Sequence, residues 1–248
     1  MGASGAIFLI VAAFLTAALS GIFGMAGGLI LMGVLAFALP VAAAFVTHGI
    51  LQLVANGWRA VLHRQHLQWP IIINYIVASA AAGGFVALIG FVPSRFVLFL
   101  LLGLTPLLIW APRHWFTLDA EKPTHALTSG FLVTALNLTA GVGGQLLDIF
   151  FVRTTLTRHE IVATKAATQV FSHLVKIIVY GAALWRTGVG GMPPLWLFAI
   201  AIPVSMLGTF AGGRVLDRIS DVNFKRWTAW IVTAIAVAYL IKAAQLWP

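Results

Sequence analysis

The sequence predicts an all-α polytopic membrane protein with about ten membrane segments, eight long and two short, arranged as two inverted five-segment repeats. Three observations predict this fold class. The 248 residues are 61% hydrophobic and only 8% charged, whereas soluble domains carry roughly a quarter charged residues. Apolar stretches, most of them near the ~20 residues that cross a bilayer, follow one another along the chain. A polar pattern inside these stretches also occurs twice, about half a chain apart.

The expected segments, taken in order, differ in length in one informative way. They fall at 5–23, 27–39, 42–62, 70–91, 94–112, 124–141, 143–156, 160–185, 193–213 and 222–246. The second and the seventh are short, and each begins at a Gly-Gly pair in an equivalent position of the two halves. Paired short, glycine-interrupted segments are the best sequence indication of a transporter's binding site. Residues 5–19 lack a basic leader, so we interpret them as a retained span and not a cleaved signal.

The basic residues favour ten crossings with the N-terminus outside. The inside ends then hold Arg59, Arg64, Arg113, Lys122, Arg153, Arg158, Arg214, Arg218, Lys225 and Arg226. The outside ends hold only Arg95, Arg186 and Lys242. This bias follows the positive-inside rule, which would be broken if the two short segments did not cross. An odd number of segments per half makes the repeats inverted. We place their boundary in the polar loop near 113–123, giving halves 1–118 and 119–248 that share one membrane core.

A polar stripe carries the strongest functional signal. It comprises His48, Gln52, Asn56 and Arg59 in the first half and Lys165, Gln169, His173 and Lys176 in the second. The spacing i, i+4, i+8, i+11 places each set on one helix face, and a threonine precedes each, Thr47 and Thr164. A basic group at mid-membrane costs at least ~2.5 kcal/mol, so these faces should line a polar interior.

The donors that the stripe offers are an imidazole, amides and an ammonium, which suit an oxyanion. For Gln52 and Gln169 considered alone, hydrogen bonding between helices is the alternative role. Arg59 and Lys176 lie nearer helix ends, so snorkelling to the interface is the alternative for them.

The glycine pairs, Gly27-Gly28 and Gly143-Gly144, lie 116 residues apart. Each can break a helix and leave free N–H groups at the start of the next one, where the helix dipole favours an anion. The alternative is that small residues only allow close helix packing. Because the pair is duplicated at matching positions, we expect the functional role.

Asp148 is the only acidic residue expected at membrane depth. It is our candidate for a coupling proton, and an ion pair with Lys165 is the alternative. Gln145 and Asn137 could line the same cavity. His63 and His66 form a single HxxH, which is weak evidence for a metal, so no metal ligand, cofactor or catalytic residue is expected.

The glycine-rich segments resemble the sulfite exporter TauE/SafE family, also called the toluene sulfonate uptake permease family. The resemblance rests on Ser20–Gly28 with Thr47 and Gln52, and on Thr139–Gly144 with Thr164 and Gln169. It implies a transporter of sulfite, sulfonates and related sulfur-containing anions in the bacterial inner membrane. The chain departs from the family where Leu29 and Gln145 follow the glycine pairs in place of a third glycine. Met32 and Asp148 stand near where the family often has a proline.

We therefore expect a secondary transporter and not an enzyme, with a small anion as substrate and protons as a candidate coupling ion. The expected substrate-binding residues are Gly27, Gly28, Thr47, His48, Gln52, Asn56, Gly143, Gly144, Gln145, Thr164, Lys165, Gln169 and His173. The net charge of +9 fits both anionic membrane lipids and an anion pathway. The scattered charges argue against nucleic acid, and a homodimer stays open. The alternatives are a carboxylate transporter, an anion channel, a histidine–metal membrane enzyme and a partner subunit without transport of its own.

Overall fold

The computed structural model describes residues 2–23, 26–110, 117–151, 153–188, 190–216 and 221–247. Arg113 and Arg218 lie outside these ranges, as do Gly24 and Met25 of the segment Ser20–Gly28. Within the described ranges the chain is helical without strands. In order, the elements are α1 (Ala3–Phe23), α2 (Ala26–Ala38), α3 (Val41–Leu62), η1 (Arg64–His66), α4 (Trp69–Ile89), α5 (Arg95–Leu104), η2 (Thr105–Trp110), α6 (Pro123–Thr139), α7 (Gly144–Phe151), α8 (Arg158–Thr187), α9 (Leu195–Leu216) and α10 (Asp221–Gln245).

Six of the described helices are long and apolar enough to cross a membrane: α1, α3, α4, α8, α9 and most of α10. The chain is therefore a multi-pass membrane protein, as predicted. The two glycine-broken segments form the short helices α2 and α7, of 13 and 8 residues.

The expectation of eight long segments differs from the structure at two places. The segment expected at 94–112 contains a 10-residue α-helix that passes into the 3₁₀ segment η2. Pro106 is the second residue of η2, and a proline cannot donate the backbone hydrogen bond that would continue the α-helix. Helix α6 has 17 residues and ends before Gly141, whose positive φ of 77° reverses the chain. Such a backbone conformation favours glycine.

Local sequence signals explain where the long helices begin and end. Thr157 and Glu160 form a reciprocal capping box at the start of α8, and Gly188 ends that helix with φ 62°. Gly90 ends α4 with φ 61°, and Pro70 stands in its first turn. These are the residue types that such positions favour. These signals set both ends of α8, which carries the second polar stripe.

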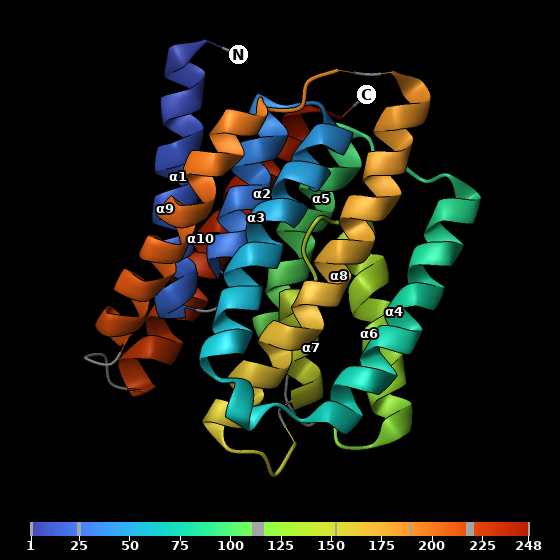
Figure 1. Ribbon diagram of the computed structural model, residues 1–248, viewed down its shortest axis with the longest axis vertical. Coiled ribbons are helices and arrows are strands. Elements are labelled where there is room, and N and C mark those ends of the chain that lie inside the picture. The colour runs from blue at the N-terminus through green and yellow to red at the C-terminus, as the bar shows by residue number, and fades with distance from the viewer. Residues whose placement is uncertain are drawn as a thin grey trace.

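The helices lie roughly side by side, with the N- and C-termini at the same end of the bundle (Figure 1). Helix α1 stops and α2 starts short of the lower end, which α3, α4 and α8 reach. The α6–α7 hairpin enters from that lower end, and its turn lies inside the bundle. The two glycine-broken hairpins thus enter the helix bundle from opposite ends.

The most extensive helix contacts join α1 to α9, α3 to α8, α4 to α6 and α5 to α10. All four join the predicted halves 1–118 and 119–248, so neither half packs as an independent unit. Helices α3 and α8 bring the two polar stripes together at the centre of this arrangement.

Candidate functional site

A cavity of about 380 Å³ lies among the two hairpins, α3 and α8. Most of the residues predicted to bind substrate line it. These are Gly28, His48, Gln52, Asn56, Gly143, Gly144, Gln145, Lys165, Gln169 and His173, together with the coupling candidate Asp148. The other three, Gly27, Thr47 and Thr164, are buried outside its lining. The cavity thus collects residues from both glycine pairs and both stripes.

The two stripes face each other across the α3–α8 contact. Because α3 and α8 run in opposite directions, the start of one stripe lies opposite the end of the other. His48 is therefore opposite Lys176, with a 2.8 Å contact between Nδ1 and Nζ. At the other end of the stripes, Arg59 and Lys165 line the same cavity. Gly49 lets the helices approach closely, because a Cβ there would lie 2.8 Å from Ile177 Cγ1.

Lys176 is fully buried at the deep end of the cavity and lies behind its lining. Its Nζ donates hydrogen bonds to His48 Nδ1 (2.8 Å), Asn137 Oδ1 (2.9 Å) and the Gly141 carbonyl (2.8 Å). Three acceptors match the three N–H bonds of an ammonium group, whereas a neutral amine has two. Among the described side chains, no carboxylate pairs with it.

The tautomer of His48 follows from its partners. Its Nε2 lies 2.9 Å from the Gly28 carbonyl, which can only accept a hydrogen bond. Nε2 therefore carries the proton, and Nδ1 accepts from Lys176. His173 is fixed in a related way, since Asn137 Nδ2 lies 3.4 Å from its Nδ1. The His173 Nε2 is then the group that can donate toward the cavity.

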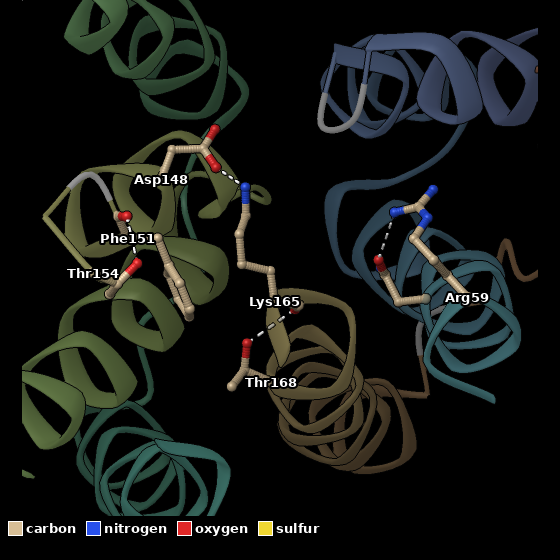
Figure 2. Close-up of polar contacts among 7 residues, drawn as sticks. Arg59, Asp148, Phe151, Thr154, Lys165 and Thr168 are labelled. Atoms are coloured by element: carbon tan, nitrogen blue, oxygen red, sulfur yellow. Dashed lines mark hydrogen bonds and ion pairs between the residues drawn. The ribbon is translucent and has the colours of Figure 1, made fainter. Parts of the chain in front are cut away.

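The shallow end of the cavity carries charged side chains, of which Asp148 is exposed (Figure 2). Lys165 extends from α8 across to Asp148 on α7 and forms an ion pair with it. The Asp148 side chain is 50% exposed and that of Lys165 is 19% exposed, so the cavity reaches the surface here. Arg59 lies on the α3 side, where its guanidinium makes only long contacts, 3.4 Å to Asn56 Oδ1 and 3.5 Å to the Ser20 carbonyl. Lys165 thus has a charged partner at the mouth of the cavity, whereas Arg59 is held only weakly by the described residues.

Gln145 has unused hydrogen-bonding capacity at both of its side-chain amide atoms. Neither its amide nitrogen nor its amide oxygen has a partner among the described residues, although both atoms are buried. An unpaired buried polar group costs about 1–3 kcal/mol. A ligand or water in the cavity would remove that cost. Thr47 Oγ1 is also buried and has no hydrogen-bond partner in the described part of the chain.

The glycine pairs serve packing and the cavity together. Gly27 lies against the Thr16 carbonyl and Ser20 of α1, whereas Gly28 faces the Gln52 amide across the cavity. A Cβ on Gly143 would lie 2.5 Å from the Val133 carbonyl. Each pair therefore combines close helix packing with backbone that lines the cavity.

A second group of polar residues was not anticipated from the sequence. The Tyr75 hydroxyl lies 2.6 Å from Ser172 Oγ and accepts a 3.4 Å hydrogen bond from Gln169 Nε2. Thr134 connects Ser172 with Ser79 through two 2.8 Å contacts. This series of hydrogen bonds orients the Gln169 side chain from the side away from the cavity. The sequence held one indication of this group. A tyrosine and single hydroxyl residues inside apolar segments are expected to be buried and therefore hydrogen-bonded.

His63 and His66 lie at the surface beside a third histidine, His159. The rings of His66 and His159 stack with centroids 5.3 Å apart. Partial burial lowers the pKa of His63, and His159, His66 and Arg59 lower it further by charge repulsion. Within the described part of the chain, no group of three or more metal-ligating side chains is placed to hold a metal ion.

The cavity therefore combines two cationic side chains at its mouth, amide and imidazole donors, and backbone from both glycine-broken hairpins. Over residues 9–239 the chain matches the protein family described as "Sulfite exporter TauE/SafE". The chain belongs to this family. Comparison with curated proteins and with solved structures gave no match. The resemblance inferred from the glycine-rich motifs is confirmed, and membership of this family indicates a membrane transport function.

Proposed function

We propose that this TauE/SafE family member is a secondary transporter of small sulfur-containing anions, with the cavity between the hairpins as its substrate site. The substrates would be sulfite or sulfonates, such as sulfoacetate and taurine-related compounds, carried across the bacterial inner membrane with proton coupling. The observation that carries the proposal is one cavity lined by residues from both glycine pairs and both stripes.

The charges of the cavity support an anionic substrate. Arg59 and Lys165 contribute two cationic groups and Asp148 one anionic group, so the lining has a cationic excess. Lys165 can exchange the Asp148 carboxylate for a sulfonate without leaving the cavity. Gln145 and Gln169 offer amide N–H groups, and charge-assisted and neutral hydrogen bonds together fix the orientation of an oxyanion.

The helix contacts support two inverted repeats as the basis for alternating access. In two inverted repeats, each helix of α1–α5 corresponds in order to one helix of α6–α10. When corresponding helices are exchanged, the α1–α9 contact becomes the α4–α6 contact, and the α3–α9 contact becomes the α4–α8 contact. The same exchange turns α1–α2 into α6–α7 and α2–α3 into α7–α8, and each of these contacts is present. The α3–α8 and α5–α10 contacts map onto themselves. Rocking of one repeat against the other would then expose the cavity to each side in turn.

The cavity reaches the surface at one end of the bundle, and the position of that end supports an inward-open state. Asp148 is exposed at the end where α3 stops near Arg59 and where α8 starts at Arg158. Arg59, Arg64 and Arg158 lie at this end, and the positive-inside rule assigns an end with many basic residues to the cytoplasm. Asp148 remains the candidate that the sequence predicts for a coupling proton.

The test is uptake of labelled sulfoacetate, taurine and sulfite into proteoliposomes, with and without a pH gradient. We expect saturable uptake of at least one of them that changes with the gradient. A carboxylate such as malonate is included, because the same donors bind carboxylates. Uptake that does not saturate would indicate a channel, and failure of folded protein to transport any sulfur anion would overturn the substrate assignment.

A further inference from the structure

The buried contacts of Lys176 and His48 connect both hairpins to the central helix pair. His48 on α3 binds the Gly28 carbonyl of the α1–α2 hairpin at 2.9 Å. Lys176 on α8 binds the Gly141 carbonyl in the α6–α7 turn at 2.8 Å. The 2.8 Å contact between Lys176 and His48 joins the two sets. We call these three contacts the central tie.

The central tie leaves one site where a proton can bind. His48 Nε2 already carries a hydrogen, because its partner is a carbonyl. The remaining ring nitrogen, Nδ1, accepts from the Lys176 ammonium. A proton that binds Nδ1 must displace that donor, so protonation of His48 and rupture of the tie are one event.

The other charged groups around His48 increase the energetic cost of that proton. Helix α8 contributes Lys176 and His173, whose ring lies 5.5 Å from the His48 ring. Arg59 lies farther along α3, at the other end of the stripe. Lys165 pairs with Asp148 at the same end of the cavity. Helix α2 carries no charged residue, and the only one on α9, Arg214, lies over the Phe210 ring. Two adjacent buried cations would therefore need an anion to balance them.

We propose that His48 is the proton-binding site through which anion binding releases the two hairpins. His48 and its neighbour His173 both line the cavity, so a bound anion would lie close to the imidazole. The anion would stabilise imidazolium, the proton would be taken up from the buffered solvent through the cavity, and Lys176 would lose one of its three acceptors. The Gly28 and Gly141 hairpins would then be free to move relative to each other. This inference rests on the proposed function and names the site of its coupling.

The experiment counts the protons taken up when a sulfonate binds. Calorimetric titration of the detergent-solubilised full chain with sulfoacetate, near neutral pH, is repeated in two buffers with different heats of ionisation. Sulfite is unsuitable because it exchanges a proton itself near neutral pH. Tris and bis-Tris are suitable, since HEPES and related buffers carry a sulfonate. We expect the wild type to take up about one proton per bound anion, since a neutral imidazole has one open basic nitrogen.

The test variant is His48→Gln, whose amide can still donate to the Gly28 carbonyl but does not titrate. We expect it to bind sulfoacetate more weakly and to take up no proton. A matched control is Tyr239→Phe, which removes a 3.0 Å hydrogen bond from α10 to the Leu29 carbonyl of the same hairpin helix. Tyr239 lies outside the cavity lining, so this variant should keep the proton uptake. Size-exclusion profiles establish that both variants are folded.

His48→Asn provides a second non-titrating variant if the glutamine variant does not fold. Proton uptake that persists in a folded His48 variant would overturn the inference. So would wild-type binding of sulfoacetate without proton uptake, although the proposed function would stand. Asp148→Asn is titrated in parallel, and loss of uptake there with retention in His48→Gln would assign the proton to Asp148. If the folded wild type bound no sulfonate, the proposed function would fail and the coupling inference with it.

Discussion

Two lysines on the same face of α8, eleven residues apart, have opposite surroundings. Lys176 is fully buried, donates to three neutral acceptors and has no carboxylate partner among the described residues. Lys165 is partly exposed at the mouth of the cavity and pairs with Asp148. The deep lysine connects hairpins, and the shallow lysine has a partner that it can exchange. Two lysines on one polar face can thus have a buried structural role at one depth and a partly exposed ion pair at another.

The same contrast separates the two ends of the cavity. At the deep end, the hydrogen bonds of His48, Lys176 and Asn137 satisfy one another. At the shallow end, Arg59 makes only long contacts with the described residues, and Lys165 pairs with the half-exposed Asp148. Satisfied buried networks are rigid, whereas weakly paired groups at a surface can reorganise. We therefore expect substitutions at the deep end to affect stability first and those at the shallow end to affect transport first.

Lys176→Met should have the largest effect on stability. It leaves three buried acceptors without a donor, each costing about 1–3 kcal/mol. A loss of roughly 3 kcal/mol lowers the melting temperature by about 6–12 °C for a chain of this size. Thermal unfolding in detergent measures this, with Lys165→Met as the matched control on the same helix face. Equal melting temperatures for the two variants would contradict the distinction between deep and shallow lysines.

Lys165→Ala should abolish transport while leaving folded protein in the membrane. The substitution removes a charge-assisted contact to the anion, worth about 1.5–3 kcal/mol, which corresponds to roughly a 10- to 150-fold loss of affinity. Proteoliposome uptake and calorimetric binding measure the two effects, and melting temperature measures folding. Normal transport by this variant would remove Lys165 from the site.

The glycine pairs allow a similar comparison between hairpins. A Cβ at Gly143 would lie 2.5 Å from a backbone carbonyl, whereas at Gly28 it would meet the flexible Gln52 side chain at 3.3 Å. Gly143→Ala should therefore destabilise the protein by about 1–3 kcal/mol, the usual cost of overpacking. We expect Gly28→Ala to cost less, because the Gln52 amide can shift. The reverse order in thermal unfolding would contradict the packing described for the α6–α7 hairpin.

Asp148→Asn should have the smallest effect on stability. The ion pair is half-exposed on the aspartate side, and such pairs contribute about 0–1 kcal/mol. Because the carboxylate no longer competes for Lys165, anion affinity should rise by a few-fold. Calorimetric titration with sulfoacetate tests this. A fall in affinity would indicate that Asp148 positions Lys165 for the substrate and does not compete with it.

Much of the fold could be predicted because bilayer physics acts on local sequence. Long apolar stretches located the six helices able to cross a membrane, and glycine pairs located the short helices α2 and α7. The end of α5 was not predicted, because the α-helix stops near Pro106 inside an otherwise continuous apolar run. Whether the two halves are inverted repeats remains a prediction that the pairing of helix contacts supports.

The sequence by itself determined the membrane class, the family, the two polar faces and most of the residues that line the cavity. Helical periodicity fixes which side chains share a face, so this much is local information. Only the tertiary structure decided which residues meet across helices. It placed Lys176 against His48 and Gly141, paired Lys165 with Asp148, and left Thr47 and Thr164 outside the cavity. Those contacts depend on the depth and register at which separate helices pack, which no single segment encodes.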